Sequence, residues 1–202
     1  MSYENEVRDL AGKCEEIPDK VSISTLRYIW QAGPFSLNRN ESLPRFLTRV
    51  NVLKEFSDYE LRLLSKYLHQ RKFQRNEVVF RQGDAGYGFY FVFKGSVSIV
   101  HISGKEVDVK EHVLAKIEKS QYFGEMGLLE EYNRRSATAI CLEETVLLGL
   151  FKPDLEALLD QHPVVGAKFM REISLILAQR LGALTEEVSK LRHRLGEKEK
   201  AL

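Results

Sequence analysis

The hydrophobic positions divide the chain into three zones with different periodicities. Up to about residue 45 the pattern is mixed, and apolar residues at helical spacing predict a short helix over 21–30. From about 46 to 152, short apolar runs alternate with glycine-containing turns, a pattern typical of β-strands. From Pro163 to about Lys200 the pattern is helical, and proline suits the first turn of a helix.

The middle zone opens with apolar residues at helical spacing between Phe46 and Phe56. Ser57, with Glu60 three residues later, is typical of a helix start. The strands that follow are predicted over 77–80, 89–93, 97–102, 107–114, 136–142 and 145–151. The fold class is therefore α+β: an antiparallel β-roll (jelly roll) with flanking helices and a long C-terminal helix.

We divide the chain accordingly into an N-terminal extension (1–45), a β-roll with its flanking helices (46–162) and a long C-terminal helix (163–202). On this helix Met170, Leu177, Leu184 and Leu191 recur every seven residues. An interleaved set, Ser174, Leu181, Val188 and Leu195, completes a heptad pattern with a polar fault at Ser174. The pattern predicts a homodimer through Met170, Leu177, Leu181, Leu184, Val188 and Leu191. The alternative is that the stripe packs on its own β-domain near its start.

Composition places the chain among soluble globular proteins. Of its 202 residues 44% are hydrophobic and 29% charged, and the net charge of +1 argues against a nucleic-acid partner. Two cysteines, Cys14 and Cys141, exclude a disulfide framework, and Cys141 is expected to be an inert core thiol. The longest apolar run, 146–151, is too short to cross a membrane. With no signal-peptide pattern, we expect a cytoplasmic protein without a membrane partner.

Familiar catalytic and metal-binding patterns are not found in the sequence. The five histidines lack metal-ligand spacing, and there is no Walker loop, nucleophile elbow or kinase signature. The glycines of 83–88 join strands and do not open a helix, so a dinucleotide site is not expected. We therefore expect no enzyme activity, no catalytic residues, no metal and no cofactor.

One segment, 123–139, carries chemistry. Glycines at Gly124 and Gly127 let the backbone turn tightly and approach a ligand, and 126–129 can form one helical turn whose N-terminus attracts an anion. Arg135 can grip a phosphate with two parallel hydrogen bonds, and Glu125 can accept a hydrogen bond from a sugar hydroxyl. Small residues after Arg135 leave room for a bound group. A phosphate, a sugar and a β-pocket together indicate a nucleotide.

This segment resembles the phosphate-binding cassette of the cyclic nucleotide-binding domain family, in the branch of the bacterial catabolite activator protein and the protein kinase A regulatory subunit. The family reads Phe-Gly-Glu-X-X-Leu and then Arg-(Ser/Ala/Thr)-Ala, and this chain reads Phe123-Gly124-Glu125-Met126-Gly127-Leu128 and then Arg135-Ser136-Ala137. Glu130-Glu131, Gly83-Asp84 and Lys94-Gly95-Ser96-Val97 also match family signatures. The likeness covers roughly residues 46–195.

The resemblance implies a role for each matched residue. Glu125 would bind the ribose 2′-hydroxyl, with the Gly124 and Met126 backbones holding the ribose and the phosphate nearby. Arg135 would pair with the cyclic phosphate, assisted by Ser136 and by the Ser136 or Ala137 N–H.

Other implied positions lie farther from the cassette. Ile99 and Leu114 match apolar positions that line the base pocket. On the long helix, Arg180 would ion-pair with Glu125, and Thr185 would bond the purine edge, from its own or a partner chain. Leu184 replaces a polar residue that the bacterial activator has beside that position.

The resulting hypothesis is a cyclic nucleotide sensor, with cyclic AMP as the ligand and cyclic GMP possible, whose ligand shifts the posture of the C-terminal helix toward an unknown effector protein. One alternative is a nucleotide-free scaffold or dimerisation module. Another is a truncated transcription factor, because the residues after Leu195 are too few to form a helix-turn-helix domain.

Overall fold

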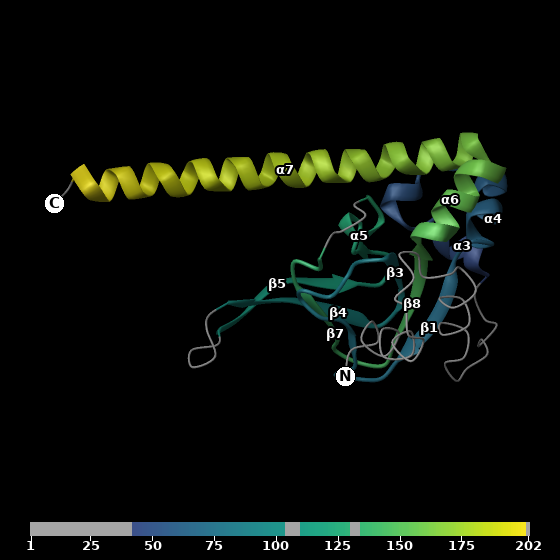
Figure 1. Cartoon of the computed structure of the whole chain (residues 1–202), viewed down its shortest axis with the longest axis horizontal. Coiled ribbons are helices and arrows are strands. Elements are labelled where there is room, and N and C mark those ends of the chain that lie inside the picture. Colours follow the sequence, from purple (N-terminus) through teal and green to yellow (C-terminus); the bar gives the residue numbers. More distant parts are fainter. Residues whose placement is uncertain (1–41, 104–109, 130–133, 201–202) are drawn as a thin grey trace, which may run out of the picture.

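The computed structural model describes residues 42–103, 110–129 and 134–200 (Figure 1). The helix predicted over 21–30, Cys14, the hairpin turn after Ser103 and Glu130-Glu131 lie outside these residues.

Eight strands of the described residues form two four-stranded antiparallel sheets, which confirms the predicted β-roll. One sheet has the order β1 (His69–Phe73), β8 (Thr145–Phe151), β3 (Gly88–Lys94), β6 (Tyr122–Phe123). The other has the order β2 (Val78–Phe80), β7 (Thr138–Cys141), β4 (Ser96–Ser103), β5 (Lys110–Glu118).

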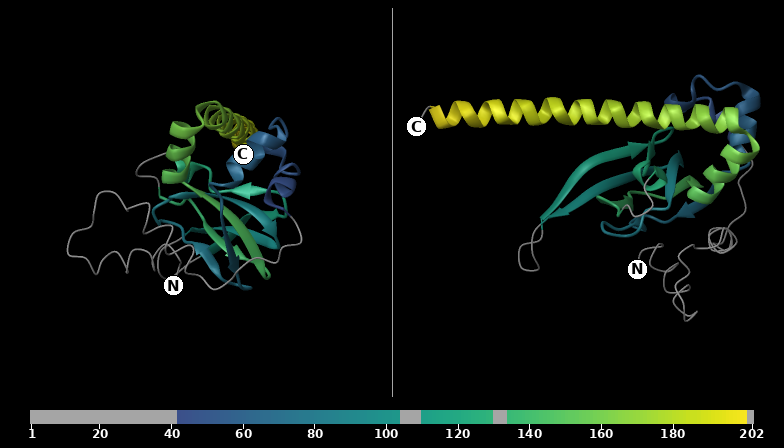
Figure 2. Two further views of the ribbon diagram at one scale, coloured as in Figure 1. Left: turned by 90° about the vertical axis from the view of Figure 1, so that its right-hand side faces the viewer. Right: turned by 45° about the horizontal axis from the view of Figure 1, so that its top comes forward.

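Helices α3, α4 and α6 lie at the end of the roll opposite the β4–β5 hairpin, whereas α7 runs from that end over the roll and past the hairpin (Figures 1 and 2). The bounds of the helices are α3 (Leu43–Leu47), η1 (Asn51–Leu53), α4 (Asp58–Ser65), α5 (Met126–Leu129), α6 (Lys152–Gln161) and α7 (Pro163–Lys200). The helical spacing between Phe46 and Phe56 is thus divided between α3 and the 3₁₀ turn η1, although both residues are buried as the pattern predicts. Ser57 caps α4 as predicted: its hydroxyl accepts from the Glu60 N–H, and the Glu60 carboxylate accepts from the Ser57 N–H.

Strand β3 contributes side chains to two apolar clusters, one on each face of its sheet. Phe89 and Phe91 pack against the helices, whereas Tyr90 and Val92 pack between the two sheets. Alternate side chains of a strand point to opposite faces, so a strand buried on both faces must be apolar throughout. Cys141 belongs to the layer between the sheets, and burial raises the pKa of its thiol to about 12. This matches the predicted inert core thiol.

Helix α7 begins at Pro163, as predicted, and runs past the end of the sheets (Figures 1 and 2). In its first half, Val165, Phe169, Ile173 and Ile176 are buried in the cluster that joins the helices to the first sheet. No helix in the part of the chain that the structure describes is long and apolar enough to span a membrane.

Candidate functional site

The 123–129 segment forms a tight turn followed by one helical turn. Phe123 ends β6, where it pairs with Tyr90 of β3, and Gly124 has φ of 83°, a conformation that L side chains rarely adopt. Gly127 and Leu128 then donate backbone hydrogen bonds to the carbonyls of Gly124 and Glu125, which begins α5. This geometry confirms the predicted helical turn, and it holds the Glu125 side chain in a buried place, 3% exposed.

Two backbone hydrogen bonds fix the position of Arg135. Its N–H donates to the Asp84 carbonyl at 2.8 Å, and its own carbonyl accepts from the Gly83 N–H at 2.8 Å. Gly83 has φ of 86°, so the predicted Gly83-Asp84 turn holds the segment that leads from Arg135 into β7. Backbone hydrogen bonds therefore join the Gly83-Asp84 turn to the cassette, although the two are far apart in sequence.

The Arg135 side chain lies inward, and Arg135 is 6% exposed. Its guanidinium donates to the carbonyl of Gly124 at 3.2 Å and to that of Gly88 at 3.0 Å. It also lies 4.0 Å from the centre of the Phe80 ring, within the range of a cation–π interaction. The guanidinium is thus held beside the residue that precedes Glu125.

Glycines make room for this side chain. A Cβ on Gly127 would lie 2.6 Å from Arg135 Nη1, and one on Gly86 would lie 3.3 Å from its Nε. Sequence reasoning treated Gly86 and Gly88 only as part of a strand connection, and it missed Gly88 and Phe80 as partners of Arg135. The density of glycines in 83–88 was the available signal for Gly88, whereas nothing in the sequence singles out Phe80.

Helix α7 reaches the cassette through Arg180. Its Nη1 pairs with Glu125 Oε1 at 2.5 Å, so the ion pair expected from the resemblance is present. The second carboxylate oxygen, Glu125 Oε2, is buried and accepts no hydrogen bond from the described residues. Tyr122 lies beside the pair, and burial is the main reason that the pKa of its hydroxyl is raised. Because a buried carboxylate oxygen is costly without a donor, Glu125 is ready to accept one.

The remaining predicted residues lie in varied environments. Met126 is half-exposed, Ser136 is exposed, and Ala137 is buried. Ile99 is partly buried against the cluster between the sheets, whereas Leu114 is 60% exposed, at a bulge where the pairing of β4 with β5 shifts register.

Thr185 is not brought to the cassette within this chain. Its hydroxyl donates to the Leu181 carbonyl one turn back at 2.8 Å, and its side chain is exposed on α7. The structure therefore joins Glu125, Arg135 and Arg180 around the cassette. Ligand contacts of all the predicted residues stay predictions.

Comparison with known proteins decides the family. Residues 70–162 match the family model described as "Cyclic nucleotide-binding domain". This part of the chain is a cyclic nucleotide-binding domain. It contains Glu125 and Arg135 together with every strand from β2 to β8.

Relatives of this cyclic nucleotide-binding domain occur in bacterial and eukaryotic regulators. The "Cyclic AMP receptor protein" of Thermus thermophilus is 36% identical over 124 residues, which cover 60% of this chain and 53% of that protein. The "cAMP-dependent protein kinase regulatory subunit" of Dictyostelium discoideum is 31% identical over 115 residues, 57% of this chain and 35% of that one. The chain thus matches about half the length of the first relative and a third of the second.

A solved structure shares the arrangement of the elements. The crystal structure of the Thermus thermophilus catabolite activator protein superposes with a TM-score of 0.61 and 31% identity, covering 69% of this chain and 62% of that one. The domain therefore has the fold of this family.

Proposed function

We propose that this chain is a regulatory protein that binds a cyclic nucleotide, cyclic AMP in the first place, between Glu125 and Arg135. The observation that carries the proposal is the state of the Glu125 carboxylate. Glu125 is only 3% exposed, and its Oε2 accepts no hydrogen bond from the described residues. A ribose hydroxyl supplies such a donor. The relatives named for cyclic AMP support the choice of nucleotide.

The cyclic phosphate would bind Arg135. Its guanidinium is planar and carries five donors, so it can hold a phosphate with two parallel hydrogen bonds. The bonds to the Gly124 and Gly88 carbonyls already orient it toward the cassette. The same side chain can therefore exchange a carbonyl partner for a phosphate oxygen without a large movement.

Arg180 gives the ligand a way to act on α7. The Glu125 carboxylate holds Arg180 in this structure, and a ribose bound to Glu125 would compete for or reinforce that contact. A ligand shifts the posture of a helix only if it binds one posture more tightly than another. We propose that the changed posture of α7 is the signal offered to an effector protein.

The second part of the proposal is a homodimer through the stripe on α7. Leu181, Leu184, Val188 and Leu191 are 67%, 59%, 46% and 46% exposed within one chain. Met170 and Leu177 are only half-buried against the domain, so the stripe is available along its length. The buried face of α7 and this stripe lie about a quarter turn apart, so both can be occupied at once.

Calorimetric titration with cyclic AMP and cyclic GMP tests the binding proposal. We expect saturable binding of cyclic AMP, and loss of at least about ten-fold in affinity in Arg135→Leu, because a charge-assisted hydrogen bond contributes ~1.5–3 kcal/mol. Arg62→Leu is the matched control, since it removes the same charge from an exposed position on α4. Circular dichroism checks that both variants fold.

The outcomes separate the alternatives. No heat with either nucleotide at high micromolar concentration would favour the nucleotide-free scaffold. Equal affinity in Arg135→Leu would remove the phosphate assignment. If cyclic AMP binds but leaves hydrogen exchange of the α7 amides unchanged, the helix-posture mechanism is wrong.

A further inference from the structure

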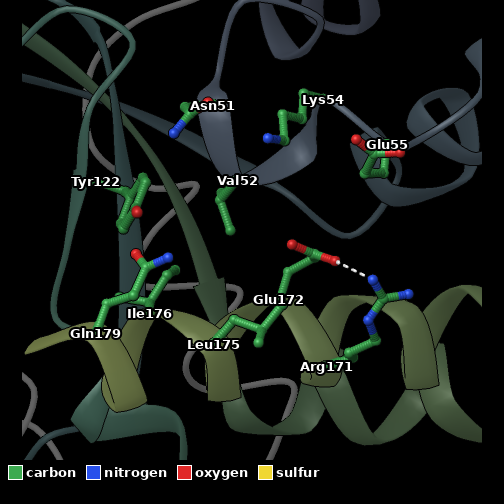
Figure 3. A pocket seen from close by; sticks show the side chains of 10 residues that line it. All are labelled: Asn51, Val52, Lys54, Glu55, Tyr122, Arg171, Glu172, Leu175, Ile176 and Gln179. Carbon is green, nitrogen blue, oxygen red and sulfur yellow. Dashed lines mark ion pairs between the residues drawn. The ribbon is translucent and has the colours of Figure 1, made fainter. Parts of the chain in front are cut away.

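A cavity of about 260 Å³ lies between η1, β6 and α7 (Figure 3). At 3.6 residues per turn, its lining residues on α7 lie on a different face of the helix from the proposed dimer stripe. Val52 of η1 and Ile176 of α7, which are 5% and 6% exposed, form its apolar base, and the Leu175 side chain extends this surface. Its volume is below that of sites for drug-sized molecules and suits a metabolite of about ten non-hydrogen atoms.

Glu172 gives this cavity a buried carboxylate that can bind a ligand. Its carboxylate points from α7 into the space below η1 (Figure 3), and the residue is 8% exposed. Its Oε1 accepts no hydrogen bond from the described residues. Arg171 Nη2 is 3.7 Å from that oxygen, too far for a hydrogen bond, and its side chain is 68% exposed. A buried carboxylate in this state needs a donor.

Charges of both signs line the cavity. Glu172 and Glu55 supply two carboxylates, and Lys54 and Arg171 supply two cations. A ligand with a single charge would meet an opposite charge on one side and a like charge on another. A zwitterion satisfies both signs, because its ammonium can pair with a carboxylate while its own carboxylate pairs with a cation.

Amide and apolar groups complete the match. Asn51 and Gln179 offer amides that can donate to a carboxylate or accept from an ammonium. The apolar base of Val52, Leu175 and Ile176 can cover an aliphatic side chain. We propose that the cavity binds a free α-amino acid with an aliphatic side chain, whose ammonium group pairs with Glu172 and whose carboxylate faces Arg171 and Lys54. The lining of this site does not include Glu125, and the proposal does not rest on the proposed nucleotide function.

Calorimetry with each of the twenty amino acids, at up to about 10 mM, tests the site. We expect saturable binding of at least one aliphatic amino acid, such as L-leucine. The analogues with only one charge, isopentylamine and 4-methylpentanoate, should each bind at least about ten-fold more weakly. No binding by any amino acid, or equal binding of L-leucine and either analogue, would overturn the proposal.

Two variants locate the binding. Glu172→Gln keeps the shape and removes the charge, so the affinity for L-leucine should fall at least about ten-fold. Glu186→Gln is the control, because Glu186 is exposed on α7 and pairs with Lys190 outside the cavity. If Glu172→Gln does not fold, Leu175→Trp fills the cavity from a half-exposed position and should abolish binding. Unchanged affinity in whichever of the two variants folds would contradict the assignment.

Discussion

The two halves of α7 carry similar apolar side chains but have different surroundings. Between Pro163 and Gln179 the helix buries Phe169 and Ile173 completely against its own domain. Between Arg180 and Arg194 the large apolar side chains of the stripe are 46% or more exposed. A helix gains most of its stability from packing an apolar face, so the first half is stable within one chain and the second half needs another surface.

The largest expected difference between the halves is in folding stability. Phe169→Ala should lower the free energy of unfolding by about 3–5 kcal/mol, because it empties a fully buried site in the first half. Leu181→Ala, in the second half, should change it by less than ~0.5 kcal/mol at concentrations where light scattering gives a monomer mass. Urea titrations followed by circular dichroism measure both. Equal losses would mean that the second half also packs on its own domain.

The second half should control association. Leu184→Glu places a charge in the stripe, and we expect it to convert dimers to monomers, since a buried unpaired charge is costly. Ser189→Glu adds the same charge about a third of a turn away and should leave the dimer intact. Light scattering over a range of concentrations gives the mass of each. A parent protein that is monomeric throughout would contradict the proposed dimer.

Gly166 and Gly182, one in each half of α7, differ in the space around them. A Cβ on Gly166 would lie 2.8 Å from Leu159 Cδ2 and 2.9 Å from Leu159 Cα, whereas one on Gly182 would meet nothing within 4 Å. Gly166→Ala should therefore destabilise the protein by ~1–3 kcal/mol through overpacking. Gly182→Ala should instead stabilise it by about 0.5–1 kcal/mol, because alanine favours the helix. Thermal unfolding measures both, and a stabilised Gly166→Ala would show that α6 and α7 separate easily.

The smallest difference concerns ion pairs. The Ser57 N–H and then Lys168 hold the pKa of Glu60 below its usual value of 4.5. A lowered folded-state pKa adds stability above the unfolded pKa, and that stability is lost as the pH falls below about 4.5. Lys168→Met should therefore lower the free energy of unfolding by a few tenths of a kcal/mol more at pH 7 than at pH 3.

The matched pair in the second half is Lys190 with Glu186, whose side chains are 65% and 68% exposed. Lys190→Met should show no such pH dependence, because solvent screens an exposed pair. Urea midpoints at the two pH values test both variants. Equal pH dependence in the two variants would contradict the assignment to the first-half pair.

The sequence predicted features that are set locally. Glu125, Gly124 and α5 are close in the chain, so their spacing predicted the helical turn. The capping box at Ser57 was readable for the same reason.

Features that depend on distant packing were not readable. The acceptors of Arg135 include the Gly88 carbonyl of β3, 47 residues away, and its stacking partner Phe80 comes from β2. The cavity beside Glu172 is built from three elements, and no local pattern brings Asn51 and Tyr122 to one helix.

The length of α7 turns small adjustments at its base into large displacements. From Gly166 to Lys200 the helix contains no proline, and at ~1.5 Å per residue this arm is about 50 Å long. A tilt of about 10° at the Gly166–Leu159 contact would carry the far end by ~9 Å, while the residues around Arg180 would move by less than half of that. Any such tilt would therefore be amplified toward the far end of the helix.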